Sequence, residues 1–166
     1  MRVREGGPAD LPAIRRIARA SFDRVYGFFA ARGIKGAWPL LVAEGEDTSV
    51  AGFLEGKLFD GAPPIGYIYF VAVDPDYRRR GVASMLLSEA LHAFDGRGVT
   101  RVFAAVPRNN AASLQLFASF GFHRTPRRAL RLWYGWRGLL IPLRMLIAPR
   151  ETLLVRTFTD PSPAPR

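Results

Sequence analysis

Apolar positions along the chain follow two spacings, one typical of helices and one typical of strands. Leu11, Ile14 and Ile17 recur every three or four residues, which predicts a helix with Asp10 as its N-cap. Short apolar runs between glycine, proline and acidic turns predict strands instead. Strands are expected at 2–4, 40–44, 50–59, 65–73, 101–106, 122–134 and 152–158, and further helices at 23–31, 81–94 and 110–120.

The segment 65–73, IGYIYFVAV, is apolar at both odd and even positions. A strand of this kind is covered on both faces and lies in the middle of its sheet. No internal repeat and no linker interrupt the alternation of strands and helices. We therefore expect one α/β domain over 1–158, with an amphipathic insert at about 134–150 and a loose, proline-rich tail at 159–166.

Composition narrows the possible chemistry. The 166 residues contain no cysteine and two histidines, which excludes disulfides and cysteine metal sites and argues against any metal site. No signal peptide is visible at the N-terminus, and a cytoplasmic protein is expected. The formal net charge of +10 comes from 24 basic and 14 acidic residues. Such a surface attracts nucleic acid, anionic lipid, phosphorylated ligands or acidic proteins.

Three arginines and a glycine, RRRG at 78–81, stand between the predicted strand 65–73 and the predicted helix 81–94. The first backbone N–H groups of a helix have no partner within the helix, and they lie at the positive end of its dipole. A phosphate satisfies them, and glycine allows close approach to the backbone. This loop is therefore a candidate pyrophosphate site, although neither a Walker loop nor a GxGxxG fingerprint is present.

Two motifs in this order resemble those of the GCN5-related N-acetyltransferases (GNAT), which bind acetyl-coenzyme A. RRRGVA at 78–83 is similar to the family signature Arg/Gln-x-x-Gly-x-Gly/Ala. NAASLQLFASFGF at 110–122 is similar to its Asn-x-x-Ala … Leu-Tyr … Leu-Gly-Phe segment. The resemblance covers about residues 1–125. It implies a mixed, largely antiparallel sheet of about seven strands, splayed at the coenzyme site and flanked by about four helices.

The resemblance also implies how acetyl-coenzyme A is held. Backbone amides from Arg79 to Ser84 would hold the pyrophosphate beside Arg78, while the strand backbone near Val71 and Val73 pairs with the pantetheine arm. One N–H group of this strand would hold the acetyl carbonyl and stabilise the negative charge that its oxygen gains during acetyl transfer. The implied coenzyme-binding residues are Val71, Val73, Arg78, Arg79, Arg80, Gly81, Val82, Ala83, Ser84, Asn110 and Phe117.

The proton-transfer residues depart from the family pattern. Phe117 stands where the family carries a tyrosine that acts as the general acid. Ala105 stands where some peptide-acetylating members carry a glutamate or histidine that acts as the base. The remaining catalytic candidates are Glu55, on the strand next to the presumed active strand, and Tyr67, where some N-terminal acetyltransferases carry a tyrosine that positions water. The alternatives are core packing for Tyr67 and a solvated or salt-bridged strand carboxylate for Glu55.

The segment 127–150 combines aromatic, basic and aliphatic residues, including Trp133, Tyr134 and Trp136. Four interpretations remain open: a lid over the acceptor, a homodimer face, an extra packed helix, or a contact of 138–148 with an anionic membrane. We expect a homodimer face or core packing before membrane contact.

The sequence thus predicts an acetyl-coenzyme A-dependent N-acetyltransferase that uses no metal. The expected acceptor is a peptide or protein N-terminus, or a small amine that carries an anionic group which arginines can bind. Two alternatives are a catalytically lapsed acyl-coenzyme A-binding module and a basic nucleic-acid-binding protein. No nucleic-acid motif is present, so no nucleic-acid partner is expected.

Overall fold

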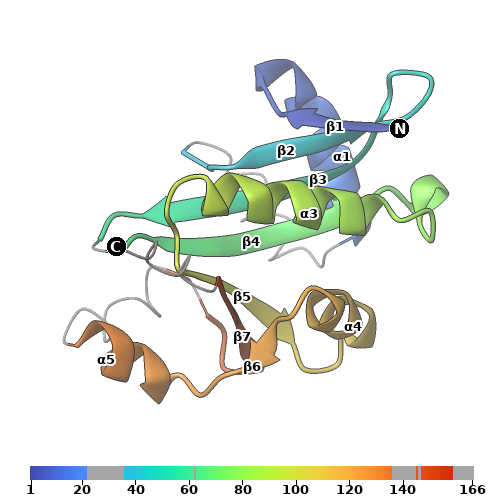
Figure 1. Ribbon diagram of the computed structural model, residues 1–166. Helices are drawn as coiled ribbons and strands as arrows, with labels where there is room; N and C mark the ends of the chain where they lie inside the picture. Colours follow the sequence, from blue (N-terminus) through green and yellow to red (C-terminus); the bar gives the residue numbers. More distant parts are fainter. Residues whose placement is uncertain (22–35, 62, 136–144, 146, 159–166) are drawn as a thin grey trace.

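The computed structural model describes residues 1–21, 36–61, 63–135, 145 and 147–158. Their strands form a seven-stranded sheet in the order β1-β2-β3-β4-β5-β7-β6. Neighbouring strands are antiparallel except β4 and β5, which are parallel (Figure 1). The strands are β1 Arg2–Glu5, β2 Leu40–Glu44, β3 Val50–Phe59, β4 Ile65–Val73, β5 Arg101–Pro107, β6 His123–Arg124 and β7 Glu151–Thr157.

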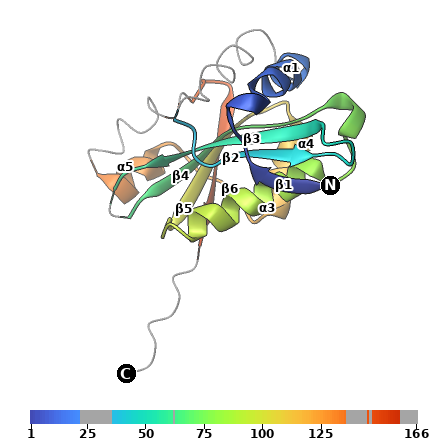
Figure 2. The same cartoon turned by 90° about the horizontal axis from the view of Figure 1, so that it is seen from above.

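Helices cover both faces of this sheet (Figures 1 and 2). On one face, α3 and α4 pack on the largest apolar cluster, which includes Leu54, Ile68 and Phe94. On the other, α1 packs on Phe53 and Ala72, and α5 contributes Leu130 to a separate cluster. The described helices are α1 Leu11–Ser21, α3 Val82–Asp95, α4 Ala111–Ser119 and α5 Arg128–Tyr134, with 3-10 turns at Pro8–Asp10 and Pro75–Tyr77. The expected mixed sheet of seven strands with four helices is confirmed.

The start of α3 lies close against the sheet because β3 carries a glycine beneath it. A Cβ atom at Gly52 would stand 2.8 Å from the Ala72 carbonyl oxygen and 3.1 Å from Val82 Cγ1. Any larger residue would therefore move the first turn of α3 outward. Gly52 thus fixes the position of the loop that leads into α3.

The two parallel strands separate part-way along their length, as the resemblance implies. Pairing of β4 with β5 runs from Ile65 with Arg101 to Ile68 with Ala104, but both strands continue beyond these pairs. The register of β3 against β4 shifts at the same level. Glu55 pairs with Phe70 and the next residue, Gly56, pairs with Ile68, which leaves Tyr69 as a bulge.

Two predictions about local structure are wrong. The expected strand 122–134 is β6 at His123–Arg124 followed by α5, because Pro126 ends the strand and the next apolar residues, Ala129 and Leu130, are buried by helix formation. Asp10 does not cap α1. Its carboxylate accepts the N–H of Gly7 at 2.8 Å and closes the 3-10 turn.

Three predictions lie partly or wholly outside the described residues. These are the helix at 23–31, most of the insert at 134–150 with its suggested membrane contact at 138–148, and the tail at 159–166. Within the described part of the chain, no helix is long and apolar enough to cross a membrane.

Candidate active site

The loop between β4 and α3 presents unpaired backbone donors. The first hydrogen bond within α3 runs from the Met85 N–H to the Gly81 carbonyl at 3.0 Å, which leaves the N–H groups of Val82, Ala83 and Ser84 without helical partners. Gly81, the N-cap, has φ +78° and supplies no side chain to cap them. Only glycine adopts this conformation without strain, and a Cβ there would face open space. The predicted anion site therefore has the expected backbone geometry.

The three arginines of the loop are exposed, and two of them have partners. The Arg78 Nε–H donates to the Val73 carbonyl at 3.3 Å. The Arg80 guanidinium lies 5.4 Å from the centre of the Tyr77 ring, and the Tyr77 hydroxyl contacts Ser49 Oγ at 2.9 Å. Arg79 adopts a left-handed backbone with φ +61°. The arginines thus surround the free amides of α3 with positive charge.

The loop is also tied to α1 on the other face of the sheet. Asp74, the residue after β4, is buried, accepts the Asp76 N–H at 3.1 Å and forms an ion pair with Arg16 of α1. Arg78 contacts Ser21, the last residue of α1. These contacts hold the end of β4 in place. The start of α3 therefore has a defined position beside the splay, the place beyond Ile68 where β4 and β5 separate.

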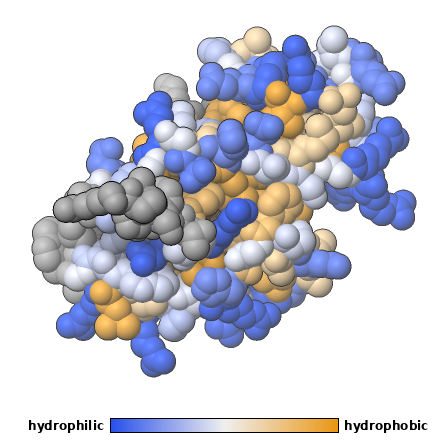
Figure 3. Space-filling view, viewed as in Figure 1, coloured by the Kyte–Doolittle hydropathy of each residue, from blue (hydrophilic) through white to orange (hydrophobic). Residues whose placement is uncertain are grey.

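Beyond Ile68 the β5-facing edge of β4 pairs with no described strand, although the Val73 carbonyl accepts from Arg78. The Asp74 N–H donates to the Ala51 carbonyl of β3 at 2.9 Å, so Asp74 and Ala72 direct their backbone groups toward β3. Since these groups alternate in a strand, Val71 and Val73 direct theirs toward β5, where the ladder has ended. In Figure 3, apolar side chains form a band across the middle of the molecule, between β4 above and β5 below. An extended arm can add to this edge as a strand does.

The two predicted residues from the second motif have structural partners of their own. Asn110 is the N-cap of α4, and its Oδ1 accepts the Ser113 N–H at 3.1 Å. Phe117 is 3% exposed and packs edge-to-face on Phe122, with ring centres 5.0 Å apart. Their roles toward a coenzyme remain predictions. Asn110 is exposed, and Phe117 belongs to the core on the α3 and α4 side of the sheet.

Glu55 is the most unusual ionisable group in the described structure. It is 2% exposed, and its Oε2 finds no hydrogen-bond partner among the described residues. Burial raises the pKa of Glu55 to about 8, against a smaller lowering by the charge of Lys57. The expected alternative of a solvated strand carboxylate is therefore wrong. Strongly shifted pKa values cluster at functional sites, which makes Glu55 a candidate for acid–base chemistry.

Glu55, Tyr67 and Tyr69 lie on the same face of the sheet, opposite α3. Glu55 alternates with Leu54, which belongs to the cluster under α3, while Tyr67 and Tyr69 pack in the cluster under α5. Tyr67 is 3% exposed and meets the Tyr69 ring edge-to-face at 4.7 Å. The bulge at Tyr69 turns both Tyr69 and Phe70 toward this face, with their rings stacked at 6.3 Å. The site thus has one side under α3 and α4, where the coenzyme is predicted to bind, and an aromatic side with a buried carboxyl group.

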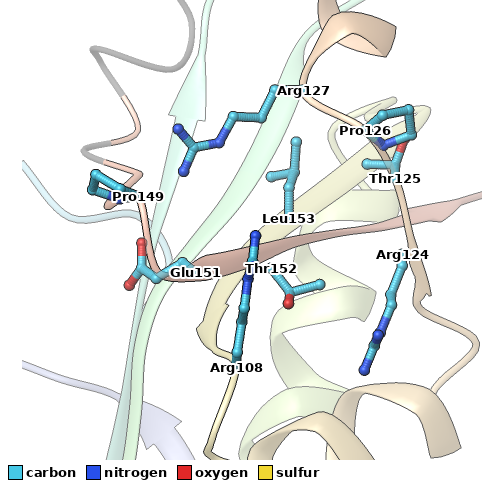
Figure 4. Close-up of a pocket in the computed structure, with 9 residues that line it drawn as sticks. All are labelled: Arg108, Arg124, Thr125, Pro126, Arg127, Pro149, Glu151, Thr152 and Leu153. Atoms are coloured by element: carbon cyan, nitrogen blue, oxygen red, sulfur yellow. The ribbon is translucent and has the colours of Figure 1, made fainter.

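Sequence reasoning missed a basic pocket on this second face. A pocket of about 610 Å³ lies between the ends of β5 and β7 and the segment that follows β6, and its lining includes Arg108, Arg124 and Arg127 (Figure 4). All three arginines were visible in the sequence, but they come from separate segments. Only the pairing of β5 and β6 with β7 brings them together. No group of three or more potential metal ligands occurs in the part of the chain that the structure describes.

A family model for the acetyltransferase (GNAT) family matches residues 12–122, about two-thirds of the chain. The chain belongs to the GNAT family. The match includes the splayed strands, the loop before α3 and α4. The resemblance inferred from RRRGVA and from the segment 110–122 is thereby confirmed, and the GNAT domain is that of an acetyl-transferring enzyme.

Relatives with assigned functions match shorter segments of this GNAT domain. The [ribosomal protein bS18]-alanine N-acetyltransferase of Salmonella typhimurium is 38% identical over 61 residues, 37% of this chain and 41% of that protein. A mycothiol acetyltransferase from Thermobifida fusca is 34% identical over 79 residues, 44% of this chain and 24% of that protein. The chain thus spans less than half the length of these curated relatives, and their acceptors differ from one another.

Solved structures share the GNAT fold over almost the whole chain. Ard1 from Thermoplasma volcanium has a TM-score of 0.72 at 22% identity and covers 96% of this chain and 98% of its own. The PaiA N-acetyltransferase of Thermoplasma acidophilum, solved in complex with coenzyme A, has a TM-score of 0.71 at 15% identity and covers 95% and 98%. At these identities the likeness establishes the fold.

Proposed function

We propose that this GNAT protein transfers the acetyl group of acetyl-coenzyme A directly to an amine, as an N-acetyltransferase of peptide N-termini or of small anionic amines. The observation that carries the proposal is the splay. The free edge of β4 at Val71 and Val73 leads straight into a loop with three unpaired helix amides and three arginines. An extended arm that ends in a pyrophosphate, as in coenzyme A, has complementary groups along this path.

In this proposal the chain supplies positioning and proton transfer. A backbone N–H of β4 at the splay donates to the acetyl carbonyl, whose oxygen gains negative charge as the amine attacks. Glu55, when ionised, takes the proton that the amine must lose, directly or through a water. The bond from nitrogen to the acetyl carbon forms while the carbon–sulfur bond breaks, and coenzyme A leaves as the thiolate. Tyr67 and Tyr69 form the apolar wall beside Glu55.

Acetyl-coenzyme A binding tests the core of the proposal. We expect micromolar affinity by calorimetry, a higher melting temperature with ligand, and loss of both in Gly81→Glu, which places a side chain and a negative charge among the free amides. Gly98→Glu is the matched control. Gly98 also has a positive φ, +68°, and an open Cβ direction, but it lies beyond the other end of α3. Equal coenzyme affinity in the two variants would contradict the assignment.

A second candidate function is an acyl-coenzyme A-binding module without turnover. It is favoured by Phe117, which cannot donate a proton, and by Ala105 at the position of the usual base. Coenzyme binding without acetylation of any amine in a broad panel would support it. Membership of the GNAT family favours either of these functions over nucleic-acid binding.

A further inference from the structure

The basic pocket lies at the end of the sheet where β4 and β5 separate. Arg108 follows the last residue of β5, which pairs with Glu151, the first residue of β7. Because β4 and β5 are parallel, the end of β5 and the end of β4 at Val73 lie at the same edge of the sheet. The pocket and the splay therefore open at the same edge.

The pocket also lies on the face that carries the aromatic wall. Leu153, which lines the pocket, shares an apolar cluster with Tyr67, and Tyr69 packs against that cluster. Ala105 of β5 pairs with Leu153 and stands between it and β4. β5 lies between β4 and β7, and β4 has already parted from β5 at Tyr69, so the pocket is at least two strand spacings, on the order of 10 Å or more, from Tyr69. Ala105 is half-buried and packs against the same cluster.

Two guanidinium groups point into this pocket, Arg108 through its centre and Arg127 from its upper edge (Figure 4). Arg127 donates to the carbonyl oxygens of Ile147 and Ala148, which fixes its position and uses part of its five N–H groups. For the Arg108 side chain, the described residues provide no hydrogen bond and no ion pair. Arg124 points away from both. The pocket thus holds two cations with spare donors.

The single acidic residue in the lining lies away from Arg108. Glu151 is buried on the Arg127 side of the pocket, where its Oε2 accepts the Ala148 N–H at 2.7 Å and Arg127 donates to the Ala148 carbonyl. Figure 4 shows its carboxylate beside Pro149 and turned away from Arg108. Adjacent guanidinium groups repel each other unless an anion lies between them, and their planar forks match the oxygens of carboxylates and phosphates.

We propose that this pocket binds a carboxylate or phosphate group of the amine acceptor. The acceptor would lie across Ala105, with its amine at the splay and its anionic group on the order of 10 Å away, between Arg108 and Arg127. The inference rests on the proposed acetyl transfer and adds the class of acceptor to it. It assigns to Arg108 and Arg127 a role that neither GNAT motif includes.

Acetylation of matched amines tests the proposal. Each pair in the panel matches an anionic amine with a neutral one. The pairs are ω-amino carboxylates of increasing length and the corresponding amides, phosphoethanolamine and ethanolamine, and short peptides that carry either Asp or Asn at one position. We expect kcat/KM to be about tenfold higher for the anionic member of each matched pair of suitable length, mainly through KM, because charge-assisted hydrogen bonds hold it. Arg108→Ala and Arg127→Ala should remove this preference and leave the neutral amines unchanged.

Arg131→Ala is the control, since Arg131 is exposed on α5, outside the pocket, and its loss removes the same charge. Equal rates for anionic and neutral acceptors in the wild-type protein would overturn the proposal, as would an equal loss of preference in Arg131→Ala. Weaker coenzyme A binding in the Arg108 variant would assign the pocket to the coenzyme instead. The Gly81 variants test the proposed function separately, because they report on coenzyme binding alone.

A binding measurement decides the matter even if no amine in the panel is acetylated. Inorganic phosphate is titrated into the protein in saturating coenzyme A, which occupies the loop before α3, and the heat is compared with that of the double variant Arg108→Ala/Arg127→Ala. Binding by the wild type that the double variant loses supports an anion site. Equal heats in both proteins refute it.

Discussion

Replacing Glu55 by Gln should stabilise the protein, and the gain should grow as the pH rises. Gln keeps the size of the side chain but never ionises. In the folded protein burial raises the pKa of Glu55 from its ordinary 4.5 to about 8, so the folded state binds a proton that the unfolded state has lost between these two values. Stability of the wild type therefore falls with pH across this window, and that of Glu55→Gln does not.

The size of the effect follows from the two pKa values. At about 1.4 kcal/mol per pH unit, the span from 4.5 to about 8 corresponds to on the order of 5 kcal/mol above pH 8, and to about 3 kcal/mol at pH 7. For a domain of this size, such a difference raises the melting temperature by roughly 10 °C or more at pH 9. Below pH 4.5 the two proteins should differ little.

Urea unfolding of the wild type and Glu55→Gln, followed from pH 4.5 to 9, measures this difference directly. Glu46→Gln is the control, because Glu46 is exposed on the turn between β2 and β3 and its replacement should leave the pH profile unchanged. Parallel stability profiles for wild type and Glu55→Gln across this range would refute the raised pKa, and with it the argument for Glu55 as a base.

Two further predictions concern catalysis. If Glu55 is the base, kcat should rise with pH through an apparent pKa of about 8, and this pKa should be the same for acceptors whose amines differ in pKa. The rise should vanish in Glu55→Gln. An apparent pKa that follows the amine of each acceptor would exclude Glu55 as the base. Phe117→Tyr should fold and give an equal or higher kcat, because a phenol becomes available near the leaving sulfur; loss of turnover in a folded variant would show that Phe117 does not occupy the family's acid position.

The sequence predicted most of this fold because its signals were local. The apolar run of β4, the helical spacing of α1 and the glycine that begins α3 each follow from a few neighbouring residues. The error at 122–134 is also local in origin, since alternation and helical spacing both fit a short segment rich in arginine and aromatic residues.

The candidate site was less predictable, because its decisive features depend on tertiary contacts. The bulge at Tyr69 arises from the pairing of two strands, and no residue type or motif in the sequence marks it. The high pKa of Glu55 comes from its burial on the sheet, which no motif encodes. The meeting of Arg108 and Arg127 requires the register of three strands.

The bulge at Tyr69 changes which residues an engineer would choose to vary. Up to Tyr69, odd-numbered positions of β4 face α5, whereas beyond it the even-numbered Phe70 and Ala72 face α1. Val71 and Val73 turn to the opposite side, toward α3. A library built on strict alternation from Tyr67 would therefore mutate the face under α3, where the coenzyme is proposed to bind, while intending to reshape the opposite face, where the acceptor is proposed to bind. Randomising Tyr67, Tyr69 and Phe70 together keeps the diversity on one surface.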